Sequence, residues 1–189
     1  LPVYRFTGRE AWFPDEYAHR LGLAPDKAKV KPYKPLECLF DYQKAIAQTA
    51  IRKQKYAIFA DCGLGKTIMQ LTWAENVVRH TNRPVLILTP LAVGEQTVGE
   101  ANKFGIEAAR SLDGTKSKNI TIANYERLHY FDANDFAGVV CDESSILKNF
   151  AGATRNALIA QWAHTPYRSS WSARANCSDT PAAQVGVIG

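Results

Sequence analysis

The chain has 189 residues, 46% of them hydrophobic and 22% charged, which is ordinary for a soluble globular protein with one full core. No uninterrupted apolar run approaches the roughly 18 residues of a membrane span, and no signal peptide is present, so a membrane partner is not expected. The chain begins at Leu1 and not at Met, so we expect the natural N-terminus, with any localisation signal, to lie upstream.

The net charge of +5 is distributed unevenly. Residues 1–55 hold 11 Lys and Arg against 6 Asp and Glu, whereas residues 56–189 hold 12 of each. This excess is compatible with a polyanionic partner, although a charge of this size alone says little. Four cysteines without C-x-x-C spacing predict reduced thiols in a cytoplasmic protein and no zinc site: Cys38, Cys62, Cys141 and Cys177.

Residues 1–35 are predicted to form an irregular, basic lead-in. Lysines alternate with Ala, Val and Pro up to Pro35, and the prolines favour an extended connector over a helix. A basic strip that includes Tyr33 is able to contact a nucleic-acid backbone. The alternative, a solvated linker, is favoured by composition alone.

From residue 36 onward, apolar runs alternate with helical patterns. Helices are predicted at 41–55, with Asp41 as N-cap, and at 68–80, 91–104 and 154–163; strands are predicted at 56–59, 85–88, 120–123 and 138–141. This alternation predicts right-handed βαβ units and a mainly parallel sheet. The polar motifs follow the strands, at the edge where open α/β sheets bind ligands.

Ala60–Thr67, with the sequence ADCGLGKT, lies between an apolar run and a helical pattern, as a phosphate-binding loop requires. Gly63 and Gly65 allow backbone N–H groups to converge on phosphate oxygens. Lys66 is predicted to reach the β- and γ-phosphates of ATP, and the Thr67 hydroxyl to bind Mg²⁺. The strict pattern has glycine where Ala60 stands.

Asp142 and Glu143 close the apolar strand at 138–141. In phosphate-loop enzymes an acid at such a strand end helps to hold Mg²⁺, and a second carboxylate can orient or deprotonate the attacking water. An isolated Asp-Glu pair is usually solvated surface. Downstream of a phosphate-binding loop the same pair predicts a catalytic role.

Together these motifs resemble superfamily 2 helicases and translocases, most of all the phage-encoded, chromatin-remodeller-like branch. Residues 60–67 resemble motif I, in which Ala is common at the first position, and Asp142–Ser145 resembles motif II. The order of the weaker motifs also agrees: Leu39–Gln43 resembles the Gln motif, Leu88–Leu91 motif Ia and Thr121–Leu128 motif Ib.

The resemblance implies a fold, a set of site residues and partners. The fold is α/β: a RecA-like phosphate-loop fold, a three-layer sandwich with a mainly parallel central sheet. The resemblance implies that Gln43 contacts the adenine edge and that the rest of ATP is bound by Cys62, Gly63, Leu64, Gly65, Lys66 and Thr67. Thr67 and Asp142 are expected to bind Mg²⁺, and Lys66 and Glu143 to act in catalysis. Nucleic acid is expected to contact Thr89, Pro90, Asn124 and Tyr125. DNA is favoured over RNA. For Thr89 and Tyr125, simple packing is an equally weighted alternative.

The pattern breaks after Arg168. Motif III is expected there as an apolar strand ending in Ser/Thr-Ala-Thr, but the sequence is SSWSARAN, half serine, with Arg174 at the Thr position. We therefore divide the chain into residues 1–35, a RecA-like lobe at 36–168, and an aberrant or truncated tail at 169–189. The second lobe of the family, which supplies an arginine finger, has no counterpart here, so the sheet is predicted to be incomplete at its C-terminal part.

The leading hypothesis is the ATP-binding lobe of a nucleic-acid-dependent ATP hydrolase, intracellular and phage-encoded in a bacterial host, which moves along DNA or RNA. Without a second lobe we expect weak Mg-ATP binding and poor hydrolysis, because an arginine finger contributes about 10³–10⁵ in rate. Two alternatives remain: a non-catalytic, nucleotide-gated nucleic-acid-binding module or decayed remnant, and, less favoured, a phosphate-loop kinase.

Overall fold

The apolar runs of the middle of the chain form β4 (Val85–Thr89) and β6 (Ile120–Asn124), in which every residue is buried. Successive side chains of a strand point to opposite faces. Accordingly, Val85 and Ile87 belong to one hydrophobic core, and Leu86 and Leu88 belong to a second core. A strand covered on both faces needs apolar residues on both, so these runs do not alternate with polar residues.

The computed structural model describes residues 5–7, 10–12, 33–117, 119–145, 156, 160–172 and 184–186. The chain divides into two units, Leu1–Pro32 and Tyr33–Gly189. Within the first unit, β1 (Arg5–Thr7) pairs antiparallel with β2 (Glu10–Trp12), so the predicted irregular lead-in contains a hairpin. The lysines at 27, 29 and 31 lie outside the described residues.

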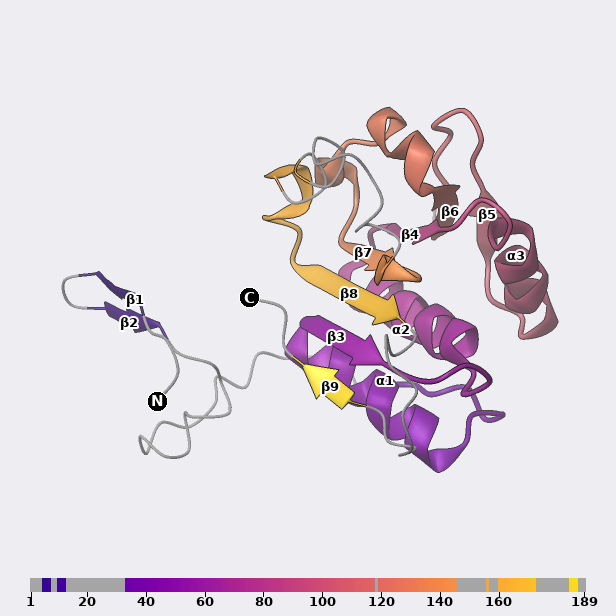
Figure 1. Ribbon diagram of the computed structural model, residues 1–189, viewed down its shortest axis with the longest axis horizontal. Helices are drawn as coiled ribbons and strands as arrows, with labels where there is room; N and C mark the ends of the chain where they lie inside the picture. The colour runs from indigo at the N-terminus through magenta and orange to yellow at the C-terminus, as the bar shows by residue number, and fades with distance from the viewer. Residues whose placement is uncertain are drawn as a thin grey trace. The chain divides into compact units, whose positions relative to one another are not determined.

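The second unit contains one sheet with the strand order β5–β6–β4–β7–β8–β3–β9 (Figure 1). Its first six strands run parallel to one another: β5 (Ala108–Arg110), β6, β4, β7 (Gly138–Cys141), β8 (Tyr167–Ser172) and β3 (Lys55–Phe59). The last, β9 (Gln184–Gly186), is an antiparallel edge strand on β3. The predicted α/β fold with a mainly parallel sheet is therefore confirmed, while β5 and β9 were not predicted.

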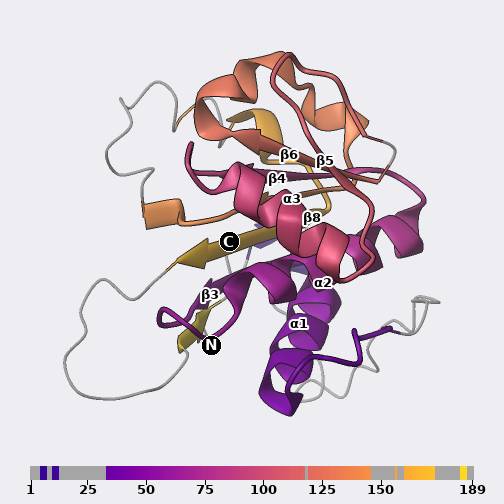
Figure 2. The ribbon, with the colours of Figure 1, turned by 90° about the vertical axis from the view of Figure 1, so that its right-hand side faces the viewer.

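Three helices cover one face of this sheet: α1 (Asp41–Lys53), α2 (Lys66–Thr81) and α3 (Gly94–Lys103). The helix α2 contacts both α1 and α3, and Figure 2 shows α3 in front of the strands. The other face is covered by the 3-10 helices η2 (Tyr125–Tyr130) and η3 (Ala133–Asp135) and by Trp162. The sheet is thus the middle layer of three.

Two helix starts differ from the predictions. Asp41 is the first helical residue of α1, and the N-cap is Phe40, whose backbone N–H donates to the Gln43 side chain at 3.0 Å. The helix predicted at 91–104 begins only at Gly94. Of the helix predicted at 154–163, residues 156 and 160–162 are helical, and most of the rest lies outside the described residues.

Strand β8 occupies the centre of the sheet, between β7 and β3, and the boundary predicted at residue 168 falls inside it. Ser169 and Ser172 are buried on either side of Trp171, which is fully buried. Next to this strand, the indole of Trp73 lies 3.3 Å from the point that a Cβ on Gly138 would occupy, and it meets the Tyr167 ring edge to face, at 6.3 Å between centroids. The large indoles supply the apolar volume that Val or Leu supplies in other strands.

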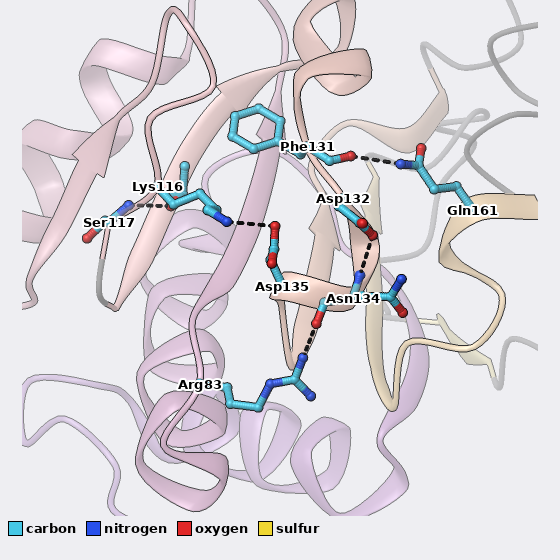
Figure 3. A network of polar contacts seen from close by, with 9 residues as sticks. Arg83, Lys116, Ser117, Phe131, Asp132, Asn134, Asp135 and Gln161 are labelled. Atoms are coloured by element: carbon cyan, nitrogen blue, oxygen red, sulfur yellow. Dashed lines mark hydrogen bonds and ion pairs between the residues drawn. The ribbon is translucent and has the colours of Figure 1, made fainter.

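A polar network fixes the opposite end of the sheet, where β4 and β7 begin (Figure 3). Arg83 donates to the Asn134 carbonyl, and Lys116 pairs with Asp135 at 2.7 Å. Gln161 donates to the Phe131 carbonyl at 2.7 Å. These contacts tie η3 and the residue Phe131 before it to three separate segments, and they leave the carboxyl ends of the strands for the candidate site.

Cys38, Cys62 and Cys141 are all unpaired thiols, and Cys177 lies outside the described residues. Within the described part of the chain, no helix is long and apolar enough to cross a membrane.

Candidate functional site

The turn between β3 and α2 adopts the backbone conformation that the phosphate-binding motif predicts. Gly63 and Gly65 both have positive φ angles, 83° and 71°, which residues with a Cβ rarely adopt. Gly65 is the N-cap of α2, so the first turn of this 16-residue helix directs its N–H groups and its positive dipole end toward the loop. A turn of this shape offers converging backbone donors to an anion.

Gln43 connects α1 to this loop. Its side-chain nitrogen donates to the Leu64 carbonyl at 3.0 Å, and a Cβ on Gly65 would lie only 2.5 Å from the same nitrogen. Glycine is therefore favoured at position 65 by φ, and a side chain there would also displace the Gln43 amide. The predicted contact of Gln43 with adenine stays a prediction, and the structure shows its amide bonded to the loop and to the Phe40 N–H.

Lys66 lies between the loop and the acidic pair. Its ammonium group donates to the Ala60 carbonyl at 3.1 Å and to the Asp61 carbonyl at 3.4 Å, and lies 3.9 Å from a Glu143 carboxylate oxygen. The Lys66 side chain is 11% exposed. The fold thus brings together two motifs that are far apart in the sequence, the loop after β3 and the acids after β7.

Asp142 is buried, and its carboxylate is held by the fully buried Gln70, whose side-chain nitrogen donates to Oδ1 at 2.6 Å. Gln70 lies on α2, one turn after Thr67. The Asp142 N–H donates to the Leu88 carbonyl at 2.9 Å, which extends the β4–β7 pairing by one residue. The carboxylate, the Thr67 hydroxyl and the Lys66 ammonium are the groups expected of a Mg-ATP site, and they fit both ligands.

Burial raises the pKa of the Asp142 carboxyl, and the negative charge of Glu143 acts in the same direction; the Gln70 hydrogen bond and the charge of Lys66 act against it. A carboxyl whose pKa is raised by folding costs stability where it is ionised, and this cost disappears as the pH falls through the raised pKa. A bound Mg²⁺ would offset the same cost. The buried Asp142 carboxyl is therefore less stable in its ionised form at a position where a cation is expected.

Asp142→Asn should stabilise the ligand-free protein and abolish the Mg²⁺ dependence of nucleotide binding. Asparagine keeps an oxygen for the Gln70 donor but removes the buried charge. The midpoint of thermal unfolding should rise, by roughly 2–4 °C per kcal/mol recovered. Calorimetry with and without Mg²⁺ measures both effects, and the matched variant Asp132→Asn, at an exposed residue, should change neither.

A second group of polar atoms gathers at the first residue of α3. Thr89 and Asn124 are register partners at the ends of β4 and β6, and both are at least 98% buried. Thr89 Oγ1, Asn124 Oδ1 and Arg110 Nε all lie within 3.5 Å of the point that a Gly94 Cβ would occupy. None of these three atoms has a hydrogen-bond partner among the described residues.

The remaining candidates are distributed as follows. Cys62 and Gly63 are exposed, and Leu64, Thr67 and Pro90 are partly buried. Tyr125 is 1% exposed, and its hydroxyl donates to the Asp142 carbonyl at 2.6 Å, so it packs in the interior instead of facing solvent. For Tyr125 the packing alternative describes what the structure shows.

Three residues of these sites escaped the sequence analysis: Gln70, Arg110 and Ser170. The sequence gives one indication for Gln70: it is a polar residue on the buried side of a helical pattern, and such a residue needs a hydrogen-bond partner. Arg110 lies on the unpredicted strand β5. Ser170 donates to the Ser144 hydroxyl at 2.7 Å and so links β8 to the turn after Asp142, a contact that only the strand order brings about.

Solved structures with the same architecture are helicase ATPase cores. The SWI2/SNF2 ATPase core of Sulfolobus solfataricus, solved with double-stranded DNA, superimposes with a TM-score of 0.63 at 21% identity over 75% of this chain and 33% of that chain. The UvsW helicase of bacteriophage T4 gives 0.61 at 10% identity over 83% and 67% of the two chains, and the Hef helicase domain of Pyrococcus furiosus gives 0.55 at 18% over 74% and 33%. The fold is that of the RecA-like lobe of such ATPase cores.

A sequence relative of this helicase-like lobe is protein p41 of Acyrthosiphon pisum secondary endosymbiont phage 1, which is 29% identical over 147 residues. No family model matches the sequence. The match covers 65% of this chain but 32% of the phage protein, so the chain spans about a third of the length of p41 and of the Sulfolobus core.

Proposed function

We propose that this lobe binds Mg-ATP and nucleic acid, with DNA favoured, and serves as the ATPase half of an intracellular, phage-type helicase or translocase. The observation that supports this most directly is the Lys66–Glu143 approach of 3.9 Å beside the buried Asp142. It joins a phosphate-binding loop to an acidic pair on one edge of a helicase-like sheet. In this proposal the second lobe of the motor is supplied outside residues 1–189.

Each residue of the ATP site has a proposed task. Gly63, Gly65 and the first turn of α2 bind phosphate oxygens through N–H groups, and Lys66 exchanges its two carbonyl partners for phosphate. Thr67 and Asp142 hold Mg²⁺, which neutralises charge on the β- and γ-phosphates when bound. Glu143 orients the attacking water and accepts its proton.

The nucleic-acid site of the proposal is the cluster of Thr89, Asn124 and Arg110 around Gly94. The first turn of α3 adds N–H groups without intrahelical partners and a positive dipole end, which together favour a phosphate. Arg110 is held there by Glu95, at 2.6 Å between Nη1 and Oε2, while the Glu95 side chain is 85% exposed. We propose that a phosphate of the nucleic-acid backbone displaces the Glu95 carboxylate and takes its place beside Arg110.

This part of the proposal predicts opposite effects for the two partners. Arg110→Gln should weaken DNA binding and reduce the slope of log K against log salt by about 1, because one phosphate contact is lost. Glu95→Gln should strengthen DNA binding, because it removes the competing carboxylate. Fluorescence anisotropy with a labelled duplex and a labelled single strand, from low to physiological salt, measures affinity and slope.

The Lys116–Asp135 pair provides matched controls, because it is an exposed ion pair of similar length at the opposite end of the sheet. Lys116→Gln and Asp135→Asn change the net charge as the test variants do but should leave the slope unchanged. Equal effects at both pairs would show that overall charge alone attracts DNA. A chain that binds Mg-ATP but shows no salt-dependent DNA binding would instead favour the phosphate-loop kinase.

A further inference from the structure

The buried Tyr125 connects the two candidate sites physically. It is the first residue of η2 and directly follows Asn124, whose side chain lies at Gly94 in the nucleic-acid cluster. Its hydroxyl donates at 2.6 Å to the backbone carbonyl of Asp142, the residue proposed to hold Mg²⁺. One side chain thus reaches from the end of β6, past β4, to the end of β7.

The contact is made beside an unfavourable backbone conformation. Strand β7 ends at Cys141, and two residues later Glu143 has a φ of 46°, in the left-handed region that residues other than Gly, Asn and Asp rarely occupy. Such a conformation persists only where surrounding contacts determine it, and it is often found at catalytic positions. The Tyr125 hydroxyl satisfies the carbonyl on the N-terminal side of this turn.

The surroundings of the hydroxyl are closed to solvent. Tyr125 is 1% exposed, and Cys141, in the same hydrophobic core, and Asp142 are both buried. A carbonyl that loses a hydrogen bond in such a place is not readily solvated by water. The orientation of the Asp142 peptide therefore depends on where the Tyr125 ring lies.

We propose that Tyr125 is a positioning residue, whose hydroxyl transmits occupation of the nucleic-acid cluster at Asn124 to the Glu143 turn. The inference rests on the proposed function, since it presumes that both sites bind ligands. When a phosphate shifts Asn124, the adjoining Tyr125 moves the Asp142 carbonyl and with it the Glu143 carboxylate. Tyr125 itself contacts neither nucleotide nor nucleic acid.

The test is the coupling between the two ligands in the 189-residue chain. The dissociation constant for a DNA duplex is measured by anisotropy with and without a non-hydrolysable Mg-ATP analogue, and the ratio of the two constants gives the coupling, which in allosteric proteins is typically about 5–150-fold. Tyr125→Phe should bring this ratio to within about 2-fold of unity while each ligand alone binds within about 3-fold of the unsubstituted chain. Tyr130→Phe, on the same 3-10 helix but 52% exposed, should keep the full ratio.

Several outcomes would overturn this inference. If Tyr125→Phe keeps the coupling of the unsubstituted chain, the hydroxyl transmits nothing. If it lowers the thermal midpoint and weakens both single-ligand affinities together, Tyr125 is only a core contact. If the unsubstituted chain binds both ligands with a ratio of one, the proposed function survives and the inference fails; if it binds neither, the proposed function fails first.

Discussion

Lys66→Ala should lower the affinity of the chain for Mg-ATP by about 100-fold or more, equivalent to ~2.7 kcal/mol. The Lys66 ammonium lies at the loop where the phosphates are expected, and it is held by two loop carbonyls and the Glu143 carboxylate. A hydrogen bond to a charged group contributes roughly 1.5–3 kcal/mol, and Lys66 is predicted to make more than one. Isothermal titration calorimetry in excess Mg²⁺ measures the change.

Lys103→Ala is the matched control, because Lys103 is an exposed lysine at the last residue of α3, with its ammonium 5.5 Å from the Phe104 ring centroid. It removes the same charge and should leave the ATP affinity unchanged. Equal losses in both variants would indicate a nonspecific charge effect, and an unchanged affinity in Lys66→Ala would refute the phosphate-binding role. The variant does not separate a motor from a kinase, since both need this lysine.

The largest expected loss of stability is that of Trp171→Ala, about 3–5 kcal/mol in the free energy of unfolding, as for other buried Trp residues. Trp171 is fully buried, with an exposed fraction of 0%, and its strand β8 pairs with β7 on one side and β3 on the other. Alanine leaves a cavity between the sheet and its covering helices, and the strands on either side of β8 hold the surroundings in place, so they cannot easily collapse into it. Urea unfolding with an unchanged m-value measures the loss.

This result bears on the segment after Arg168, where the sequence pattern breaks. If that segment were foreign to the fold, Trp171→Ala would be nearly neutral, as is expected for the control Leu91→Ala at a residue that is 65% exposed. A loss of less than about 1 kcal/mol would therefore contradict the placement of β8 in the centre of the sheet.

Much of the candidate ATP site could be predicted from the sequence because its chemistry is local. The positive φ angles of Gly63 and Gly65 follow from the residue type, and the structure shows them as the motif predicts, while α2 begins at Lys66, two residues before the helix predicted at 68–80. The same holds for strands such as β4, whose buried run needs no partner to be recognised. The start of α3 was misplaced, because Leu91 and the two residues after it continue the helical pattern without forming helix.

Contacts across strands could not be read in this way. The serines of β8 argue against a buried strand, yet backbone pairing is independent of side chains, and Trp73 and Trp171 fill the space on the helical side. Burying these serines still costs stability, because the Ser169 and Ser172 hydroxyls have no hydrogen-bond partner among the described residues. Sequence rules that treat each strand alone miss this compensation.

The sequence by itself determined the class of fold, the phosphate-binding loop and the identity of the two acids, because each depends on residue types at short spacing. Only the tertiary structure decided that Gln70 holds Asp142, that Arg110 joins Thr89 and Asn124, and that Tyr125 is an interior link instead of a surface contact. These pairs depend on strand order and on which strand ends lie side by side, and distances of that kind are set by the packing of the whole sheet.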